Sequence, residues 1–162
     1  MKGWYLNSAH RWDQAIRAAD AGLAFDPNSA SLYAARGRPE ANLGRFAQAK
    51  SDAQQAMRLS PRDPFIGAWH LDLGDSELGL GHFDAAIEEY HRSDNTGCCG
   101  AAALLSLAAA YALAGKMEEA KSALADARRR EPKLTIKWLV ENHAPSVPPV
   151  VDGLRKAGLP EE

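Results

Sequence analysis

A five-residue unit recurs four times along the chain, and its spacing limits the fold more than any other feature. Each copy has a polar residue, a large apolar residue, two residues typical of helix starts, and then alanine. The copies are 11–15, 45–49, 82–86 and 116–120, so the unit returns at nearly regular intervals. Glycine precedes three copies and proline closes three units, at Gly44, Gly81, Gly115, Pro27, Pro61 and Pro132. Repeats of this length are single helical hairpins that bury their apolar faces only by stacking, so we expect a stack of hairpins.

Composition favours helices over strands. Alanine, the best helix former, is abundant, whereas the strand-favouring valine and isoleucine are scarce. The 162 residues, 46% hydrophobic and 25% charged, suffice for one globular domain with a sizeable core. A net charge of −2 argues against a broad nucleic-acid surface, and no apolar run approaches the roughly 18 residues that span a bilayer. We therefore expect an all-α chain whose partners are neither nucleic acid nor membrane.

The positions around the repeated alanines resemble the tetratricopeptide repeat (TPR), a helix–turn–helix motif of about 34 residues. The second and third units keep its glycine slot as Gly37 and Gly74, and the third has Cys98 where proline is expected. The fourth unit follows the pattern furthest, at Leu104, Leu107, Ala108, Tyr111, Ala120, Leu124 and Pro132. The resemblance implies an all-α, right-handed superhelical solenoid of antiparallel helix pairs with C-terminal capping helices.

Four repeats are expected in residues 1–132, followed by a C-terminal capping segment in residues 133–162. The repeats span about 1–29 (truncated), 30–63, 64–100 and 101–132. The expected helices of the repeats are 2–9, 12–25, 29–42, 46–59, 64–79, 83–94, 100–113 and 117–130. Helices 134–142 and 150–157 should follow, separated by the proline-rich, non-helical segment 144–149. This tail is expected to fold back over the last repeat.

Three departures from the repeat pattern stand out. Segment 62–67 holds three residues more than its counterpart in repeat two, which either lengthens the turn or extends the next helix. Pro39 falls inside an expected helix and should kink it, as a tolerated bend or as a functional hinge. The glycine-rich segment 94–100 replaces the usual turn and is expected to be long and mobile.

TPR solenoids bind along the concave face, which the first helix of each repeat lines. A mostly small and apolar groove of this kind suits an extended or helical peptide. Chaperone-binding members of the family grip a terminal carboxylate with successive cations, and Arg38 is the only counterpart here, which argues against such a clamp. The predicted groove residues are Ser31, Ala34, Arg38, Asn42, Ala68, Leu71, Asp72, Asp75, Leu105 and Ala109.

Catalytic and metal sites find little support in the sequence. His82 and His91 with the acids between them could form a metal cluster, but the same spacing describes a solvated acidic helix face, which we favour. Cys98 and Cys99 lie on an expected loop as free thiols, with a redox role as the alternative. The basic run 128–130 closes a helix, where cations offset the helix dipole. We expect no enzymatic activity, no metal and no cofactor.

The TPR positions, without a catalytic constellation, predict a protein–protein interaction scaffold that binds a peptide or partner domain. Segments 60–64, 132–136 and 153–161 resemble the C-terminal TPR region of bacterial class III adenylate/guanylate cyclases and winged-helix regulators, which implies a regulatory module of a bacterial signalling protein. The alternative is a homodimer formed through the apolar residues 4–6, which no upstream repeat covers. The cysteine content and the absence of a recognisable signal peptide favour the cytoplasm.

Overall fold

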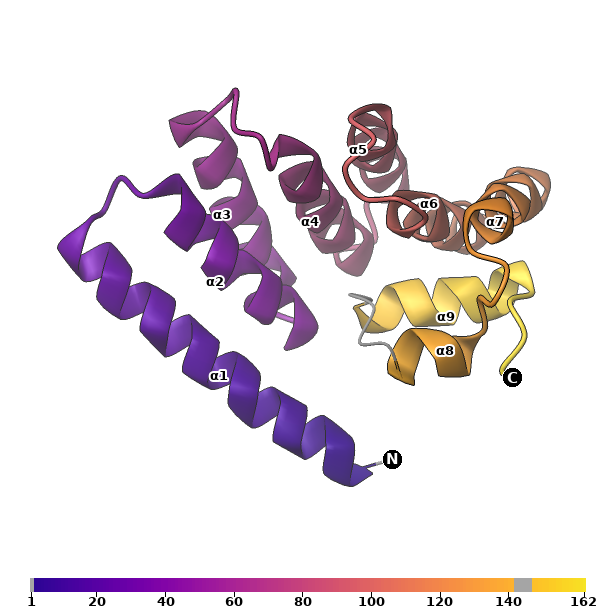
Figure 1. Ribbon diagram of the computed structural model, residues 1–162, viewed down its shortest axis with the longest axis horizontal. Coiled ribbons are helices and arrows are strands. Elements are labelled where there is room, and N and C mark those ends of the chain that lie inside the picture. Colours follow the sequence, from indigo (N-terminus) through magenta and orange to yellow (C-terminus); the bar gives the residue numbers. More distant parts are fainter. Residues whose placement is uncertain (1, 142–146) are drawn as a thin grey trace.

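The computed structural model describes residues 2–141 and 147–162, and this part of the chain holds nine helices and no strand (Figure 1). Short turns join the first seven helices in chain order, so that successive helices run back and forth across the molecule. The helices are α1 (Lys2–Phe25), α2 (Ala30–Asn42), α3 (Phe46–Leu59), α4 (Ile66–Gly79), α5 (Phe83–Asn95), α6 (Ala102–Leu113), α7 (Met117–Arg130), α8 (Ile136–Glu141) and α9 (Pro148–Ala157). The prediction of an all-α chain is confirmed.

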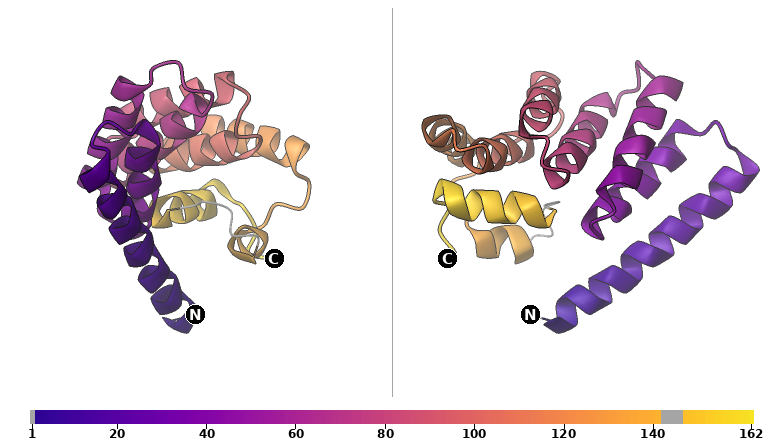
Figure 2. Two further views of the ribbon diagram at one scale, coloured as in Figure 1. Left: turned by 60° about the vertical axis from the view of Figure 1, so that its left-hand side comes forward. Right: turned by 180° about the vertical axis from the view of Figure 1, so that it is seen from behind.

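Three helical hairpins, α2–α3, α4–α5 and α6–α7, stack in sequence order behind α1. The first helices of the hairpins also approach one another, because α2 contacts α4 and α4 contacts α6. The second helices α3, α5 and α7 make no comparable contacts with one another in the described residues. The row α2, α4, α6 is therefore the tighter, inner side of a curved stack (Figure 2), and we call its surface the inner wall.

Glycine ends the first helix of each hairpin, as the repeat pattern predicts. Gly44, Gly81 and Gly115 have φ angles of 76°, 80° and 80°, the left-handed region in which a side chain is strained. A different requirement places Gly74 within α4, where a Cβ atom would stand 2.5 Å from Cε1 of the buried Tyr90. This glycine allows α4 and α5 to pack closely within one hairpin.

The first repeat differs from its prediction. Helices 2–9 and 12–25 were expected to be separate, but α1 runs unbroken from Lys2 to Phe25. That prediction is wrong because residues 8–12 contain neither glycine nor proline, and a polar residue at His10 does not by itself end a helix. α1 packs chiefly on α2, and its N-terminal end extends past that helix (Figure 1).

The starts of two further helices settle one alternative that the sequence left open and correct one prediction. α4 begins at Ile66, so the three additional residues lengthen the turn rather than the helix. α9 begins at Pro148, so Pro148 and Pro149 are helical and their predicted non-helical state is wrong. Proline is tolerated in a first helical turn because its missing N–H would have no partner there. Val147 is extended, as predicted, and residues 144–146 lie outside the described residues.

Candidate protein-interaction surface

The ten predicted groove residues all lie on α2, α4 and α6, but they differ in how far the protein buries them. Ser31 is exposed, and five others are half-buried on α2 and α4: Ala34, Arg38, Asn42, Ala68 and Asp72. The remaining four are buried: Leu71, Asp75, Leu105 and Ala109. The inner wall is thus accessible at α2 and at the adjoining side of α4, and it is buried at α6. We call the accessible part the open half; it consists of Ser31, Ala34, Arg38, Asn42, Ala68 and Asp72.

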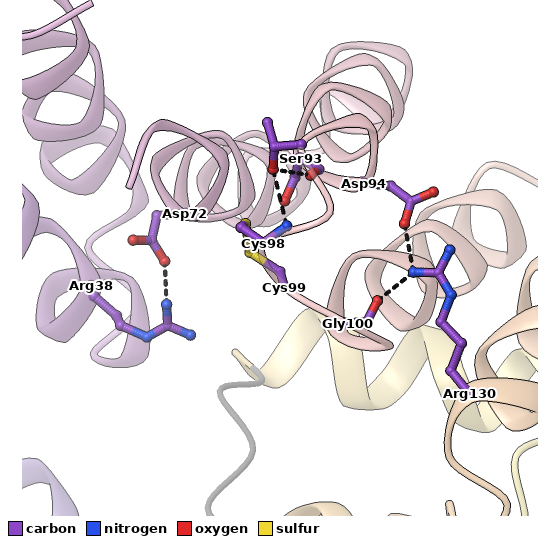
Figure 3. Close-up of a disulfide and its surroundings, with 9 residues drawn as sticks. Arg38, Asp72, Ser93, Asp94, Cys98, Cys99, Gly100 and Arg130 are labelled. Carbon is purple, nitrogen blue, oxygen red and sulfur yellow. Dashed lines mark hydrogen bonds and ion pairs between the residues drawn. A yellow bond between two sulfur atoms is a disulfide. The ribbon is translucent and has the colours of Figure 1, made fainter. Parts of the chain in front are cut away.

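An ion pair bridges the two helices of the open half. Nη1 of Arg38, on α2, donates to Oδ1 of Asp72, on α4, over 2.6 Å (Figure 3). The Asp72 side chain is 14% exposed and the Arg38 side chain 30% exposed, so the guanidinium remains accessible from solvent while it neutralises the carboxylate. Ala34, Gly37 and Trp69 pack beside this pair and leave only a crevice too narrow for a water molecule. The open half therefore presents an oriented ion pair among small and apolar neighbours.

A second carboxyl lies one helical turn further along α4. Asp75 is 3% exposed, and the buried Tyr90 hydroxyl donates a hydrogen bond of 2.9 Å to its Oδ1. Burial raises the pKa of Asp75 to about 7, against the opposing effect of Arg38. Burial likewise raises the pKa of Asp72 to about 6, again opposed by Arg38. The group formed by Arg38, Asp72 and Asp75 thus changes its net charge near neutral pH.

A separate network joins the first three helices. Arg36 of α2 donates to Asp20 of α1 and, through two nitrogens, to Asp52 of α3, each over 2.7 Å. Glu40, one turn further along α2, is 7% exposed, and burial followed by the charge of Asp52 raises its pKa to about 7. Sequence reasoning missed this network, although Arg36 lies midway in the sequence between Asp20 and Asp52, as expected of equivalent positions on successive helices. The network links α1 and α3 to α2 and is not part of the open half.

The C-terminal helix α9 covers the α6 part of the inner wall. α9 contacts α6 along most of its length, and it contacts α4 and α7 less (Figures 1 and 2). The tail therefore folds back over the last repeat, as expected, and it does so on the inner wall. Its buried face consists of Val150, Gly153, Leu154 and Ala157. The spacing of these residues by three or four is a helical signal in the sequence that could have identified this face.

α9 and α6 touch where both carry small residues. A Cβ atom on Gly153 would stand 2.6 Å from the backbone oxygen of Ala109 and 2.7 Å from its Cα atom. Ala109 has no exposed surface, so this predicted groove residue contacts the protein's own tail. Leu105 is 6% exposed, and it lines a hollow of about 300 Å³ together with Leu134 and with Leu139 of α8.

The turn between α5 and α6 contains a disulfide between adjacent residues, Cys98 and Cys99 (Figure 3). The prediction of two free thiols is therefore wrong, because this irregular turn brings the two neighbouring side chains together. Around the bridge, the Thr96 hydroxyl donates to the Ser93 carbonyl and accepts from the Cys98 amide. At the end of α7, Arg130 donates hydrogen bonds to Asp94, near the end of α5, and to the Gly100 carbonyl in the turn. Part of the basic run thus serves the packing of neighbouring repeats.

The two histidines considered for a metal cluster, His82 and His91, are hydrogen-bonded to different residues. His82 is bonded to Glu77 and His91 to Tyr111, while Glu88 and Glu89 pair with Arg92. Within residues 2–141 and 147–162, no group of three or more His, Cys, Asp or Glu side chains is placed to hold a metal ion. None of the described helices is long and apolar enough to cross a membrane.

The helix order, the hairpin stack and the glycine-terminated first helices define the chain as a TPR-type solenoid. No protein-family model matches the chain. A stretch of 73 residues is 38% identical to DnaJ homolog subfamily C member 7 of Mus musculus. This stretch covers 41% of the present chain and only 14% of that relative, so the similarity concerns one segment of a much longer protein.

Solved TPR structures share the fold over nearly the whole chain. PilW, a widely conserved type IV pilus biogenesis factor, aligns with a TM-score of 0.72 at 21% identity, over 94% of this chain and 71% of PilW. MamA aligns with a TM-score of 0.67 at 22% identity, over 90% of this chain and 86% of MamA. YrrB, described as a TPR protein with an unusual peptide-binding site, aligns with a TM-score of 0.62 at 19% identity, over 94% and 79% of the two chains. At these identities the likeness concerns the fold alone.

Proposed function

We propose that the chain is a protein-interaction scaffold that binds a short segment of a partner protein on the open half of its inner wall. The observation that carries this proposal is the Arg38–Asp72 ion pair, which lies between two first helices with the Arg38 side chain 30% exposed. A guanidinium that is 30% exposed can donate to a carboxylate or a carbonyl of a peptide. The fold supports the proposal, because TPR solenoids present this surface to partners.

A peptide-display selection against the whole chain tests the proposal directly. Peptides of about a dozen residues would be selected and the dissociation constant of the best one measured by fluorescence anisotropy. Arg38→Glu would place two carboxylates side by side and should weaken binding at least ten-fold. Arg62→Glu is the matched control, because Arg62 is exposed in the α3–α4 turn, away from the open half. A selected peptide whose binding is equally strong with both variants would refute the assignment.

Self-association is the second candidate, and the path of α1 favours it. Because α1 does not fold back as a hairpin, the stack in the described residues begins with a helix whose main partner is α2. A second copy packed there would cover this end of the solenoid. Sedimentation equilibrium of the purified chain decides between a monomer and a dimer. The proposed role in a bacterial signalling protein and the cytoplasmic location stay predictions.

A further inference from the structure

The inner wall is occupied at one end by a segment of the chain itself. α9 lies on α6 and reaches α4, so it covers the wall that continues from the open half. Its buried residues are aliphatic or small, and its outer positions Asp152, Arg155 and Lys156 are exposed. This is the arrangement of an amphipathic helix bound in a groove.

Three features of α9 suit a helix that forms on the wall and can leave it. The helix has ten residues, fewer than the roughly 12–15 that make an isolated helix stable in water, so its helicity depends on docking. Gly153 lowers intrinsic helix stability but admits the close contact with Ala109, which indicates that the docked state requires glycine here. The residues after α9 are bonded to α8, since the Ile136 amide donates to the Pro160 carbonyl and the Lys137 amide to the Glu161 carbonyl, each over 2.9 Å.

We infer that α9 is a displaceable internal ligand, and that its docking site on α6 and α4 is a second binding site for a partner helix. The inference rests on the proposed function and names a partner class for the same wall. The partner is a short amphipathic helix with glycine facing Ala109, aliphatic residues three positions before and one after it, and a small residue four positions after it. These positions correspond to Val150, Gly153, Leu154 and Ala157. When such a helix displaces α9, the covered and open halves become one continuous surface.

The test uses the whole chain and a labelled synthetic peptide of residues 147–162. Gly153→Leu should expel α9, because a side chain would meet the Ala109 backbone. Lys156→Leu is the matched control, since it adds the same side chain at an exposed position of the same helix. Hydrogen exchange followed by mass spectrometry should show residues 148–157 exchanging at least ten-fold faster in Gly153→Leu only, with α2–α7 still protected.

Fluorescence anisotropy should then show the peptide binding Gly153→Leu at least ten-fold more tightly than the wild type or Lys156→Leu. The tethered α9 competes at a high effective concentration in those two chains. A peptide that itself carries Gly153→Leu should not bind. The inference is overturned if α9 stays protected in Gly153→Leu, or if a chain with released α9 does not bind the peptide. Equal peptide binding by the wild type overturns it as well.

A second variant covers the case in which Gly153→Leu disrupts the repeats. Leu154→Asp places a charge at a position with no exposed surface and should release α9 by a different mechanism. If both variants lose the protection of α2–α7 together with that of α9, the helix is an integral part of the fold and the inference fails. Arg38→Glu should leave the binding of this peptide unchanged, so failure of the α9 site and failure of the open half are distinguishable.

Discussion

Replacing Asp75 with asparagine should stabilise the chain at neutral pH far more than at acidic pH. The carboxyl is buried, and burial raises its pKa from 3.8 to about 7. Between these two values the unfolded chain has released this proton and the folded chain has kept it. The folded state then binds more protons, so the free energy of unfolding decreases as pH rises through this window.

The size of the effect follows from the shift. Each pH unit between the two pKa values corresponds to about 1.4 kcal/mol, so the free energy of unfolding should fall by about 2–3 kcal/mol between pH 5 and pH 7 through this group. Asparagine carries no charge at either pH, and its amide oxygen can still accept the hydrogen bond from Tyr90. The advantage of Asp75→Asn over the wild type should therefore grow by that amount over the same range.

Urea unfolding followed by circular dichroism at pH 5, 6, 7 and 8 measures this difference. Asp84→Asn is the control, because the Asp84 side chain is 90% exposed and its ion pair with Lys116 lies at the surface. Its difference from the wild type should stay below about 1 kcal/mol and should not grow with pH. If the difference between Asp75→Asn and the wild type is the same at pH 5 and pH 7, the folded chain ionises Asp75 without penalty, and the burial argument is refuted.

Three further outcomes test other parts of the structure. Gly74→Ala should lower the free energy of unfolding by about 1–3 kcal/mol in urea titrations, because the new methyl group would overlap the Tyr90 ring; an unchanged midpoint would contradict the close packing of α4 and α5. Arg36→Ala should lower the free energy of unfolding by about 2–3 kcal/mol, because it leaves the buried Asp52 carboxylate unpaired. Asp20→Ala should lower it by less than about 1 kcal/mol, because Asp20 is half-exposed. Equal losses would contradict the assigned burial. Replacing both cysteines with serine should change the free energy of unfolding by about 1 kcal/mol or less, because a bridge between neighbours closes almost no loop; a larger loss would show that the turn depends on the bridge.

The sequence by itself determined the helical hairpins and their order. The repeated alanines, the glycines after each first helix and the prolines are local signals, since each reports on a few neighbouring residues. Helices 46–59 and 117–130 were predicted at the bounds that α3 and α7 have. The α1 prediction failed because a repeat pattern was extended to a segment that has no helix-breaking residue.

Only the tertiary structure decided which part of the inner wall is accessible. Leu105 and Ala109 were assigned to the groove from their positions in the repeat alone. A position in the repeat does not predict that a later segment of the chain packs on it. Whether Val150 and Leu154 face the inner wall or solvent depends on the long-range contact between α9 and α6. The small residues Gly153 and Ala109 allow that close contact once the two helices have packed together. The Arg38–Asp72 pair has the same origin, because its members lie on different hairpins and meet only after the two hairpins have stacked.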